Sequence, residues 1–518
     1  MKLKRHIHRL LALTLLQVFL LCTSAAHAIT FTVTYDPSVT DTFTGRVYVM
    51  LSSSQRMEPR NGPTWFGTEP FYAMDVKDWL PDTPLVFDDR AVSYPGPMSK
   101  LEKKTWSAQA VMRINKDSPS IGDGTGTGYS VAVREEMEGA QAETVPLRIS
   151  RVVVARPFPS NDRVVEAVCR STLLSDFHGR DMYMRAAVIL PKGATKKANE
   201  DSQRTYPALY WIGGFGSDHT SFAWMQRAWE ATGFSDSIIR VVLDPSCYGG
   251  HSVFADSANN GPVGEALVKE FIPYLEEHFP LTPDANSRFL SGHSSGGWSS
   301  LWLQITYPQE FGGTWSVAPD PVDFRDFQRI NLYAPGVNMY RDEQGNRRAL
   351  ARSGDQVLAW YDDFVAMEKV YGEGGQIRSF EWVFSPRGDD GLPMKMFDRE
   401  TGAVNPAVAE AWKKYDIQLI LRDRWKELGP QLKGKLHIFM GDVDTFYLDG
   451  ATKLLKHTLE ELGSDAVVDI EPGKDHMTIA TRALQRRTDE ELLKWYREHH
   501  PKAAASQPVS EPVGAGAD

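Results

Sequence analysis

Apolar and polar residues alternate in the first part of the chain, from residue 29 to about residue 155. The pattern is clearest in the segment 29–35, where every second residue is apolar. A period of two residues is typical of a strand with one buried face. Turn residues separate further segments of this kind, which lie at 45–51, 106–112 and 147–153. The pattern predicts an all-β sandwich domain over residues 29–155.

A different pattern begins at about residue 156. Short apolar segments at 184–190, 207–212 and 238–243 predict buried strands, and the segment 262–279 carries apolar residues at helical spacing. Strands that alternate with helices predict a mostly parallel sheet that is covered by helices on both faces. We therefore predict an α/β domain over residues 156–500.

The alternation of strands and helices is interrupted between about residue 319 and residue 432. This stretch contains the polar segment 385–391 together with helical pieces, and we predict a cap-like insertion over the active face of the α/β domain. Alternation then resumes, with strands expected at 436–440 and 466–470. The final residues, 501–518, are rich in Pro, Ala, Ser and Gly and are predicted to be disordered.

A Gly-x-Ser-x-Gly motif lies at the end of one predicted strand. Ser294 is its centre, and Gly292 and Gly296 are its two glycines. The residues before it predict a strand, and those after it carry apolar side chains at helical spacing. A serine on a sharp strand-to-helix turn is exposed to substrate, and only glycine lets the neighbouring backbone pass so closely. The motif predicts that Ser294 is a nucleophile.

A serine hydroxyl becomes a good nucleophile only when a base removes its proton, and histidine is the usual base. His476 follows the last predicted strand, so it is expected at the same edge of the sheet as Ser294. His293 is next to the serine, where adjacent side chains on a tight turn diverge. We therefore predict that His476 is the base and that His293 packs or orients its neighbours.

The histidine in turn needs a carboxylate to fix its tautomer, and in α/β-hydrolases this acid precedes the histidine in the chain. Asp442 and Asp444 both follow the predicted strand 436–440. We predict Asp444 as the acid, with Asp442 as the reserve candidate. Either aspartate could instead cap the following helix. Asp449 and Asp475 are further candidates.

An oxyanion intermediate requires preorganised hydrogen-bond donors. The backbone N–H of Ser295 is one expected donor, because it lies at the start of a predicted helix. The second is expected from the loop that follows the strand 207–212. We predict the N–H of Phe215, with that of Gly214 as the alternative.

The first 28 residues have the features of a targeting segment. A basic start precedes an apolar run at 10–21, and small residues surround a cleavage site after Ala28. We predict a cleaved signal peptide over 1–28 and a secreted or periplasmic protein, with no stable membrane insertion after the leader is removed. The formal charge is −10 and becomes −14 without the four basic residues of the leader, which argues against nucleic acid as a partner.

The cysteines and histidines give no sign of a metal site. Of the three cysteines, Cys22 lies in the predicted leader, and Cys169 and Cys247 remain. These two form either a disulfide or two separate buried thiols. The thirteen histidines include no His-Glu-x-x-His pair, so we expect neither a metal nor another cofactor.

Several segments resemble the Putative esterase family, which includes feruloyl esterases, enterochelin esterase-like proteins and S-formylglutathione hydrolases. The segments that carry the resemblance lie at 254–257, 261–262, 292–297 and 307–313. The resemblance implies an α/β-hydrolase fold and cleavage of a carboxylic ester through Ser294, Asp444 and His476. Two features depart from the family pattern. Gly213 stands where the family often has histidine, and the stretch between Ser294 and Asp444 is longer than in compact members.

These patterns together predict an exported serine hydrolase that cleaves a carboxylic ester through an acyl-enzyme intermediate. The expected substrate is a small-molecule or polysaccharide-linked ester. An acyltransferase that uses a sugar or lipid acceptor would need the same residues, and a non-catalytic binding protein could keep the same fold. A serine peptidase is a further alternative. The sequence leaves the oligomeric state open.

Overall fold

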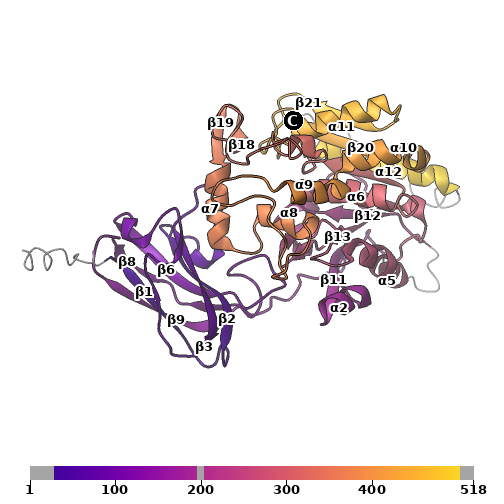
Figure 1. Cartoon of the computed structure of the whole chain (residues 1–518). Helices are drawn as coiled ribbons and strands as arrows, with labels where there is room; N and C mark the ends of the chain where they lie inside the picture. The colour runs from indigo at the N-terminus through magenta and orange to yellow at the C-terminus, as the bar shows by residue number, and fades with distance from the viewer. Residues whose placement is uncertain (1–27, 195–203, 502–518) are drawn as a thin grey trace, which may run out of the picture. The chain divides into compact units, whose positions relative to one another are not determined.

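The computed structural model describes residues 28–194 and 204–501, and the chain divides into two compact units (Figure 1). The first unit comprises the residues up to 115 together with 120–155, and the second comprises 116–119 and the residues from 156 onward. The predicted signal peptide, up to residue 27, and the predicted disordered tail, from residue 502, lie outside the described residues.

The first unit is built from strands, as the alternating pattern predicts. Its strands are β1 (Thr30–Tyr35), β2 (Phe43–Ser52), β3 (Phe71–Trp79), β4 (Leu85–Phe87), β5 (Val92–Tyr94), β6 (Lys104–Met112), β7 (Gly128–Ser130), β8 (Val133–Met137) and β9 (Thr144–Val152), with short 3₁₀ turns η1 (Pro59–Asn61) and η2 (Met98–Lys100). Hydrogen bonds join them in the order β4-β1-β9-β7-β6-β2-β3-β5, and β8 pairs with β6. The strands therefore form one continuous sheet.

This sheet folds over on itself and encloses a core. Phe31 of β1 lies against Tyr72 of β3, with ring centroids 6.4 Å apart, and Tyr35 of β1 lies against Trp79 of β3 at 4.6 Å. These strands are far apart in the sheet order, so their side chains meet across the fold. Every second residue of β1 is buried, which is the reason for the alternating pattern in the sequence.

The second unit contains an eight-stranded sheet of the α/β-hydrolase kind. Its strands are β10 (Val164–Ser171), β11 (Met182–Ile189), β12 (Ala208–Ile212), β13 (Ile239–Leu243), β16 (Arg288–His293), β17 (Gly313–Val317), β20 (Leu436–Gly441) and β21 (Val467–Glu471). Their order is β10-β11-β13-β12-β16-β17-β20-β21. The pairs β10–β11 and β11–β13 are antiparallel and the remaining pairs are parallel. The predicted fold class is confirmed.

Helices cover both faces of this sheet. They are α2 (Thr172–His178), α3 (Phe222–Glu230), α4 (Val263–Ala266), the π-helical η4 (Leu267–Phe271), α5 (Ile272–His278), α6 (Ser295–Thr306), α10 (Ile417–Leu432), α11 (Asp449–Glu461) and α12 (Arg482–His499). Tyr210 and Ile212 of β12 point to the face covered by α2, α4 and α5. Leu209 and Trp211 point to the opposite face, where α12 and α3 pack. A strand buried on both faces gives the continuous apolar segment seen in the sequence.

The stretch between β17 and β20 contains the predicted insertion. Its elements before α10 are η6 (Phe324–Asp326), β18 (Ala349–Ser353), β19 (Gln356–Trp360), α7 (Tyr361–Tyr371), α8 (Gln376–Phe384), α9 (Pro406–Trp412) and η7 (Lys413–Tyr415). Helix α10 packs against α6 and α11, so it is the crossover helix that the parallel connection from β17 to β20 requires. The insertion proper is therefore residues 318–416, and this name is used for that segment below.

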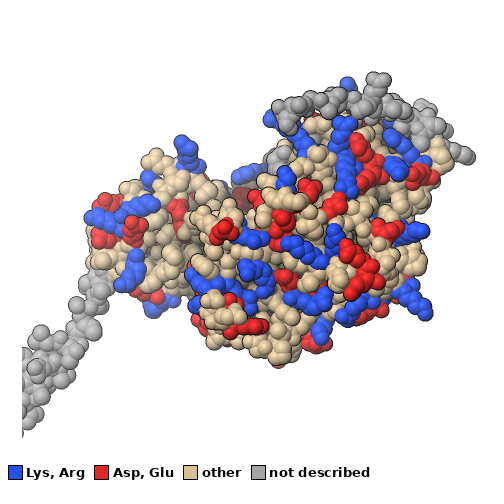
Figure 2. All heavy atoms as spheres, turned by 90° about the horizontal axis from the view of Figure 1, so that it is seen from above, with Lys and Arg blue, Asp and Glu red and all other residues tan. Residues whose placement is uncertain are grey.

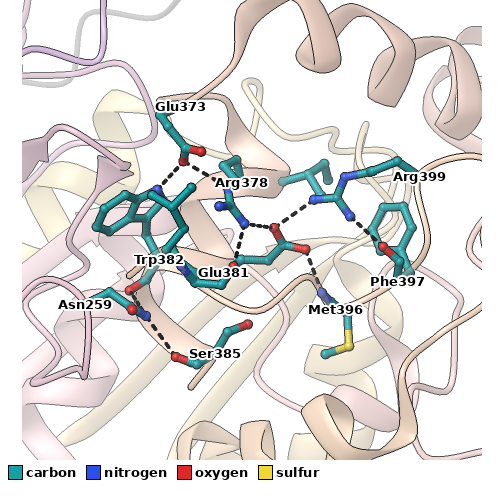
Figure 3. Close-up of polar contacts among 12 residues, drawn as sticks. Asn259, Glu373, Arg378, Glu381, Trp382, Ser385, Met396, Phe397 and Arg399 are labelled. Carbon is teal, nitrogen blue, oxygen red and sulfur yellow. Dashed lines mark hydrogen bonds and ion pairs between the residues drawn. The ribbon is translucent and has the colours of Figure 1, made fainter. Parts of the chain in front are cut away.

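A buried network of charged side chains fixes α8 inside the insertion (Figure 3). Glu381 is fully buried and accepts hydrogen bonds from Arg378 and Arg399, both at 2.7 Å, and from the backbone N–H of Met396 at 2.7 Å. Asn259, which lies outside the insertion, donates to the carbonyl oxygens of Trp382 and Ser385 at the end of the same helix. A buried carboxylate with every partner in place holds its surroundings in one arrangement.

Basic and acidic side chains are interspersed over the face shown in Figure 2. Among the described residues, no helix has both the length and the apolar character needed to cross a bilayer. Cys169 and Cys247 are free thiols, and burial raises the pKa of each. Of the two alternatives for these cysteines, the structure therefore shows separate thiols.

Candidate active site

Ser294 lies on a sharp turn between β16 and α6, as predicted for the nucleophile. Its backbone has φ 60° and ψ −123°, in the region that non-glycine residues rarely adopt. Its N–H donates to the carbonyl oxygen of Val317 at 3.0 Å, and its own carbonyl accepts from Trp298 N–H at 3.0 Å. These bonds hold the strained residue between two strand ends and the first turn of the helix.

The two glycines of the motif allow three backbone segments to meet around Ser294. A Cβ atom added to Gly292 would lie 2.1 Å from the carbonyl oxygen of Gly296. A Cβ added to Gly296 would lie 2.0 Å from the carbonyl oxygen of Ile212 at the end of β12. Both contacts involve backbone atoms that cannot move aside, so larger residues would separate the turn from β12.

His476 and Asp444 form a buried pair. Nδ1 of His476 lies 2.7 Å from Oδ2 of Asp444, and both side chains are almost completely buried. The other carboxylate oxygen, Oδ1, accepts hydrogen bonds from the backbone N–H groups of Phe446 at 2.8 Å and Leu448 at 3.3 Å. The carboxylate is thus fixed from both sides and can hold the imidazole with its proton on Nδ1.

The reserve acid, Asp442, has a different contact. Its Oδ1 accepts a hydrogen bond from the backbone N–H of Gly473 at 2.7 Å, in the turn that follows β21. It therefore joins two strand ends as a structural residue. Of the two aspartates after β20, the structure brings Asp444 to His476.

His293 supports the backbone of His476. Its Nε2 lies 2.8 Å from the carbonyl oxygen of His476, and the two rings are 4.7 Å apart. Burial, together with the charge of the neighbouring His476, lowers the pKa of His293 to about 4. The ring is then neutral near pH 7 and donates from Nε2 to the carbonyl, which agrees with an orienting role.

The segment after β12 runs directly over Ser294. A Cβ atom added to Gly214 would lie 3.1 Å from Cβ and 3.7 Å from Oγ of Ser294. The carbonyl oxygen of Gly213 accepts from Nε2 of His251 at 3.0 Å, while Nδ1 of His251 accepts from Val253 N–H. Burial lowers the pKa of His251 to about 4, which favours this neutral form. The predicted donors, Phe215 and Ser295, follow directly on Gly214 and Ser294.

A second buried carboxylate, which sequence reasoning missed, lies beside the nucleophile. Asp320 follows the end of β17; its Oδ1 accepts from Ser294 Oγ at 3.4 Å and its Oδ2 from Ser295 Oγ at 2.6 Å. Burial, with a contribution from nearby Asp444, raises the pKa of Asp320 to about 6. Its place at a strand end is the signal that could have found it.

We expect the Asp320→Asn variant to change how stability depends on pH. The pKa of Asp320 is raised to about 6 in the folded protein, above an ordinary value of about 3.9. Such a group stabilises the fold below its ordinary pKa, and this contribution is lost as the pH rises through 6. Thermal unfolding of both proteins from pH 4 to pH 7 should therefore show the Tm of wild type falling relative to the variant. A constant difference in Tm would contradict the assignment.

A further histidine, His219, anchors the chain just beyond the segment that covers Ser294. Its Nδ1 lies 2.9 Å from Asp244 and its Nε2 lies 2.9 Å from Glu166. Burial opposes the charged form of this ring, but the two carboxylates outweigh burial and raise the pKa of His219. No local pattern in the sequence indicates this contact, because Glu166 lies in β10 and Asp244 follows β13.

No group of three or more His, Cys, Asp or Glu side chains suited to a metal ion occurs within residues 28–194 and 204–501. Arg387, which lies in the polar segment 385–391 of the insertion, has its guanidinium 5.9 Å from the ring centroid of Phe177.

Comparison with known proteins supports an esterase-like region. Residues 179–416 match the model of the family described as Putative esterase, which confirms the resemblance expected from the sequence. The match includes Ser294 and ends before Asp444 and His476. A search of curated proteins found no match.

Several solved structures of hydrolases are similar to the chain. A ferulic acid esterase is 12% identical, covers 64% of this chain and 98% of its own, and has a TM-score of 0.40. An S-formylglutathione hydrolase from Agrobacterium tumefaciens is 14% identical, with coverage of 65% and 96% and a TM-score of 0.38. A CE1 ferulic acid esterase from Anaeromyces mucronatus, in complex with ferulic acid, is 14% identical, with coverage of 65% and 92% and a TM-score of 0.31.

Proposed function

We propose that this chain, whose central region matches an esterase family, is a serine hydrolase that cleaves carboxylic esters through an acyl-enzyme intermediate. The observation that carries the proposal is the buried pair of His476 and Asp444, 2.7 Å apart, at the same edge of the sheet as Ser294 on its strained turn. A serine together with a base whose tautomer is fixed by a carboxylate is the combination that acyl transfer requires.

The reaction begins when the hydroxyl of Ser294 turns from Asp320 toward Nε2 of His476. Oγ attacks the acyl carbon as His476 takes the proton, and Asp444 stabilises the imidazolium that forms. The amides of Ser295 and Phe215 bind the oxyanion. The C–O bond of the ester then breaks, and the alcohol leaves with the proton from His476. Water attacks the acyl-enzyme by the same sequence and releases the acid and free Ser294.

We extend this proposal to the cellular location of the enzyme and to the class of ester that it cleaves. A leader over residues 1–28 would export the enzyme, so that it meets its ester outside the cytoplasm. Such an ester is a small molecule or is linked to a polysaccharide. The negative net charge of −10 supports a substrate other than nucleic acid.

The proposal is tested by labelling the folded protein with a fluorophosphonate probe. We expect one label per chain, on the peptide that contains Ser294, and loss of p-nitrophenyl acetate hydrolysis in proportion to labelling. Heat-denatured protein is the control and should remain unlabelled, because the serine is reactive only beside its base. Hydrolysis that persists in fully labelled protein, or a label on another residue, would refute the assignment. Product analysis with an added alcohol acceptor distinguishes hydrolysis from transfer.

A further inference from the structure

The loop that carries Asp444 is hydrogen-bonded to the insertion at three consecutive residues. We call residues 442–448, between β20 and α11, the acid loop. The carbonyl oxygen of Asp444 accepts from Nε of Arg352 at 3.1 Å, and that of Thr445 accepts from the backbone N–H of Arg352 at 2.8 Å. The carbonyl oxygen of Phe446 accepts from Nε2 of Gln328 at 3.3 Å. Backbone groups of the acid loop thus find their partners in the insertion.

Arg352 makes the largest share of these contacts. Besides its two bonds to the acid loop, its Nη2 donates to Oδ1 of Asp449, the first residue of α11, at 3.3 Å. Its guanidinium also lies over the ring of Tyr447, 4.4 Å from the centroid. Tyr447 has φ 59°, a conformation that needs support from its surroundings. The side chain of Arg352 therefore contacts Asp444 and Tyr447 of the acid loop and Asp449, which follows it.

The acid loop determines where the carboxylate and the imidazole lie. Oδ1 of Asp444 is held by the N–H groups of Phe446 and Leu448, so any change in the loop moves the carboxylate. The ring of Phe446 also packs edge-on against His476, with centroids 4.9 Å apart. A displacement of about 1 Å in a catalytic group can lower a rate by about 10²-fold.

The insertion has a second contact with the catalytic region. Oγ of Ser379, on α8, accepts from the N–H of His251 at 3.0 Å and lies 3.2 Å from its carbonyl oxygen. His251 in turn holds the carbonyl of Gly213. The buried network around Glu381 fixes the helix that carries Ser379 (Figure 3). The insertion thus reaches both the segment over Ser294 and the acid loop.

We propose that Arg352 is a positioning residue that orients Asp444, and through it His476, so that the insertion is needed for turnover as well as for any contact with substrate. This inference rests on the proposed function. Arg352 acts through the backbone of the acid loop and has no part in proton transfer. The guanidinium donates from Nε and Nη2 to two different acceptors, Asp444 and Asp449. A lysine has a single nitrogen and cannot reproduce this geometry.

The test compares Arg352→Ala with Arg347→Ala. Arg347 precedes the same hairpin of β18 and β19, but it pairs with Asp362 and Asp363 of the insertion. We expect Arg352→Ala to lower kcat by roughly 10- to 100-fold with KM changed by no more than about 2-fold. Arg352→Lys should recover part of the loss, and Arg347→Ala should change kcat by less than about 2-fold. A fall confined to kcat separates orientation from substrate binding.

Amide hydrogen exchange provides a readout that is independent of turnover. The N–H groups of Phe446 and Leu448, which bond to Asp444, should exchange faster in Arg352→Ala and at the wild-type rate in Arg347→Ala. Equal kcat values or equal exchange in the two variants would overturn the inference about Arg352. A wild-type protein without ester hydrolysis would instead overturn the proposed function, and the exchange comparison would still decide whether Arg352 holds the acid loop.

Discussion

The Ser294→Ala variant is expected to lose nearly all ester hydrolysis, with kcat lower by about 10⁴- to 10⁶-fold. The substitution removes the attacking oxygen and leaves the proposed oxyanion amides in place, so residual activity reflects those amides and substrate binding. The backbone bonds from Ser294 to Val317 and Trp298 do not involve the side chain and remain. Initial rates with p-nitrophenyl acetate, extended to hours for the variant, measure the ratio.

A serine in the helix that follows Ser294 serves as the control. Ser300 is buried in α6, and its hydroxyl donates to the carbonyl oxygen of Gly297 at 2.8 Å. We expect Ser300→Ala to keep activity within a few-fold of wild type, because it loses one internal hydrogen bond and no reacting group. If Ser294→Ala hydrolysed the ester as fast as Ser300→Ala, Ser294 would not be the nucleophile.

Replacing Asp444 with asparagine is expected to lower kcat by about 10⁴-fold, because an amide at this place favours the wrong tautomer of His476. The asparagine has nearly the same shape and can still accept from the N–H groups of Phe446 and Leu448 through its oxygen. Its amide nitrogen would then face Nδ1 of His476 and push the ring proton to Nε2, where the base must be free. Steady-state kinetics at pH 8 test this expectation.

Asp442→Asn is the matched comparison for Asp444→Asn. Both residues are aspartates in the same loop, but Asp442 bonds to the N–H of Gly473, and asparagine can keep that bond. We expect kcat of Asp442→Asn to fall by less than about 10-fold. The reverse ranking of the two variants would make Asp442 the acid.

The sharp turn at Ser294 and the position of His476 after a late strand could be predicted, because local sequence pattern determines both. A glycine-flanked serine between a strand and a helix, and a histidine after a late strand, are visible in the residues themselves. The choice between Asp444 and Asp442 could not be made with the same security. Both follow β20, and only the tertiary contacts of each carboxylate, one with His476 and one with Gly473, separate them.

Asp320 shows a second limit of sequence reasoning. The sequence pattern places it at the beginning of the predicted insertion. Its significance depends on the hydroxyls of Ser294 and Ser295, which approach it only after folding. Arg352 is similar, because its partners lie about ninety residues further along the chain. The spacing of apolar and polar residues predicts local structure, and it does not predict which distant segments come into contact.

The sequence predicts whether a segment is a helix or a strand better than it predicts where that element begins and ends. Segment 262–279 carries the helical pattern, but the structure divides it into α4, the π-helical η4 and α5, with Pro273 in the first turn of α5. A proline there lacks the N–H that a continuous helix would need. The sequence pattern places helix α10 in the predicted insertion, because its apolar spacing does not show that it packs on α6.

The large sequence separation between the residues of the candidate site has a consequence for folding. The parts of the site come from residues as far apart as Gly214 and His476, and the strand that delivers His476 is β21, near the end of the described chain. Contacts between such distant residues form slowly, because long loops must close first. During synthesis, the C-terminal segments appear last. Enzymatic activity should therefore be among the last properties to emerge from a newly made chain, and its appearance would report that folding is complete.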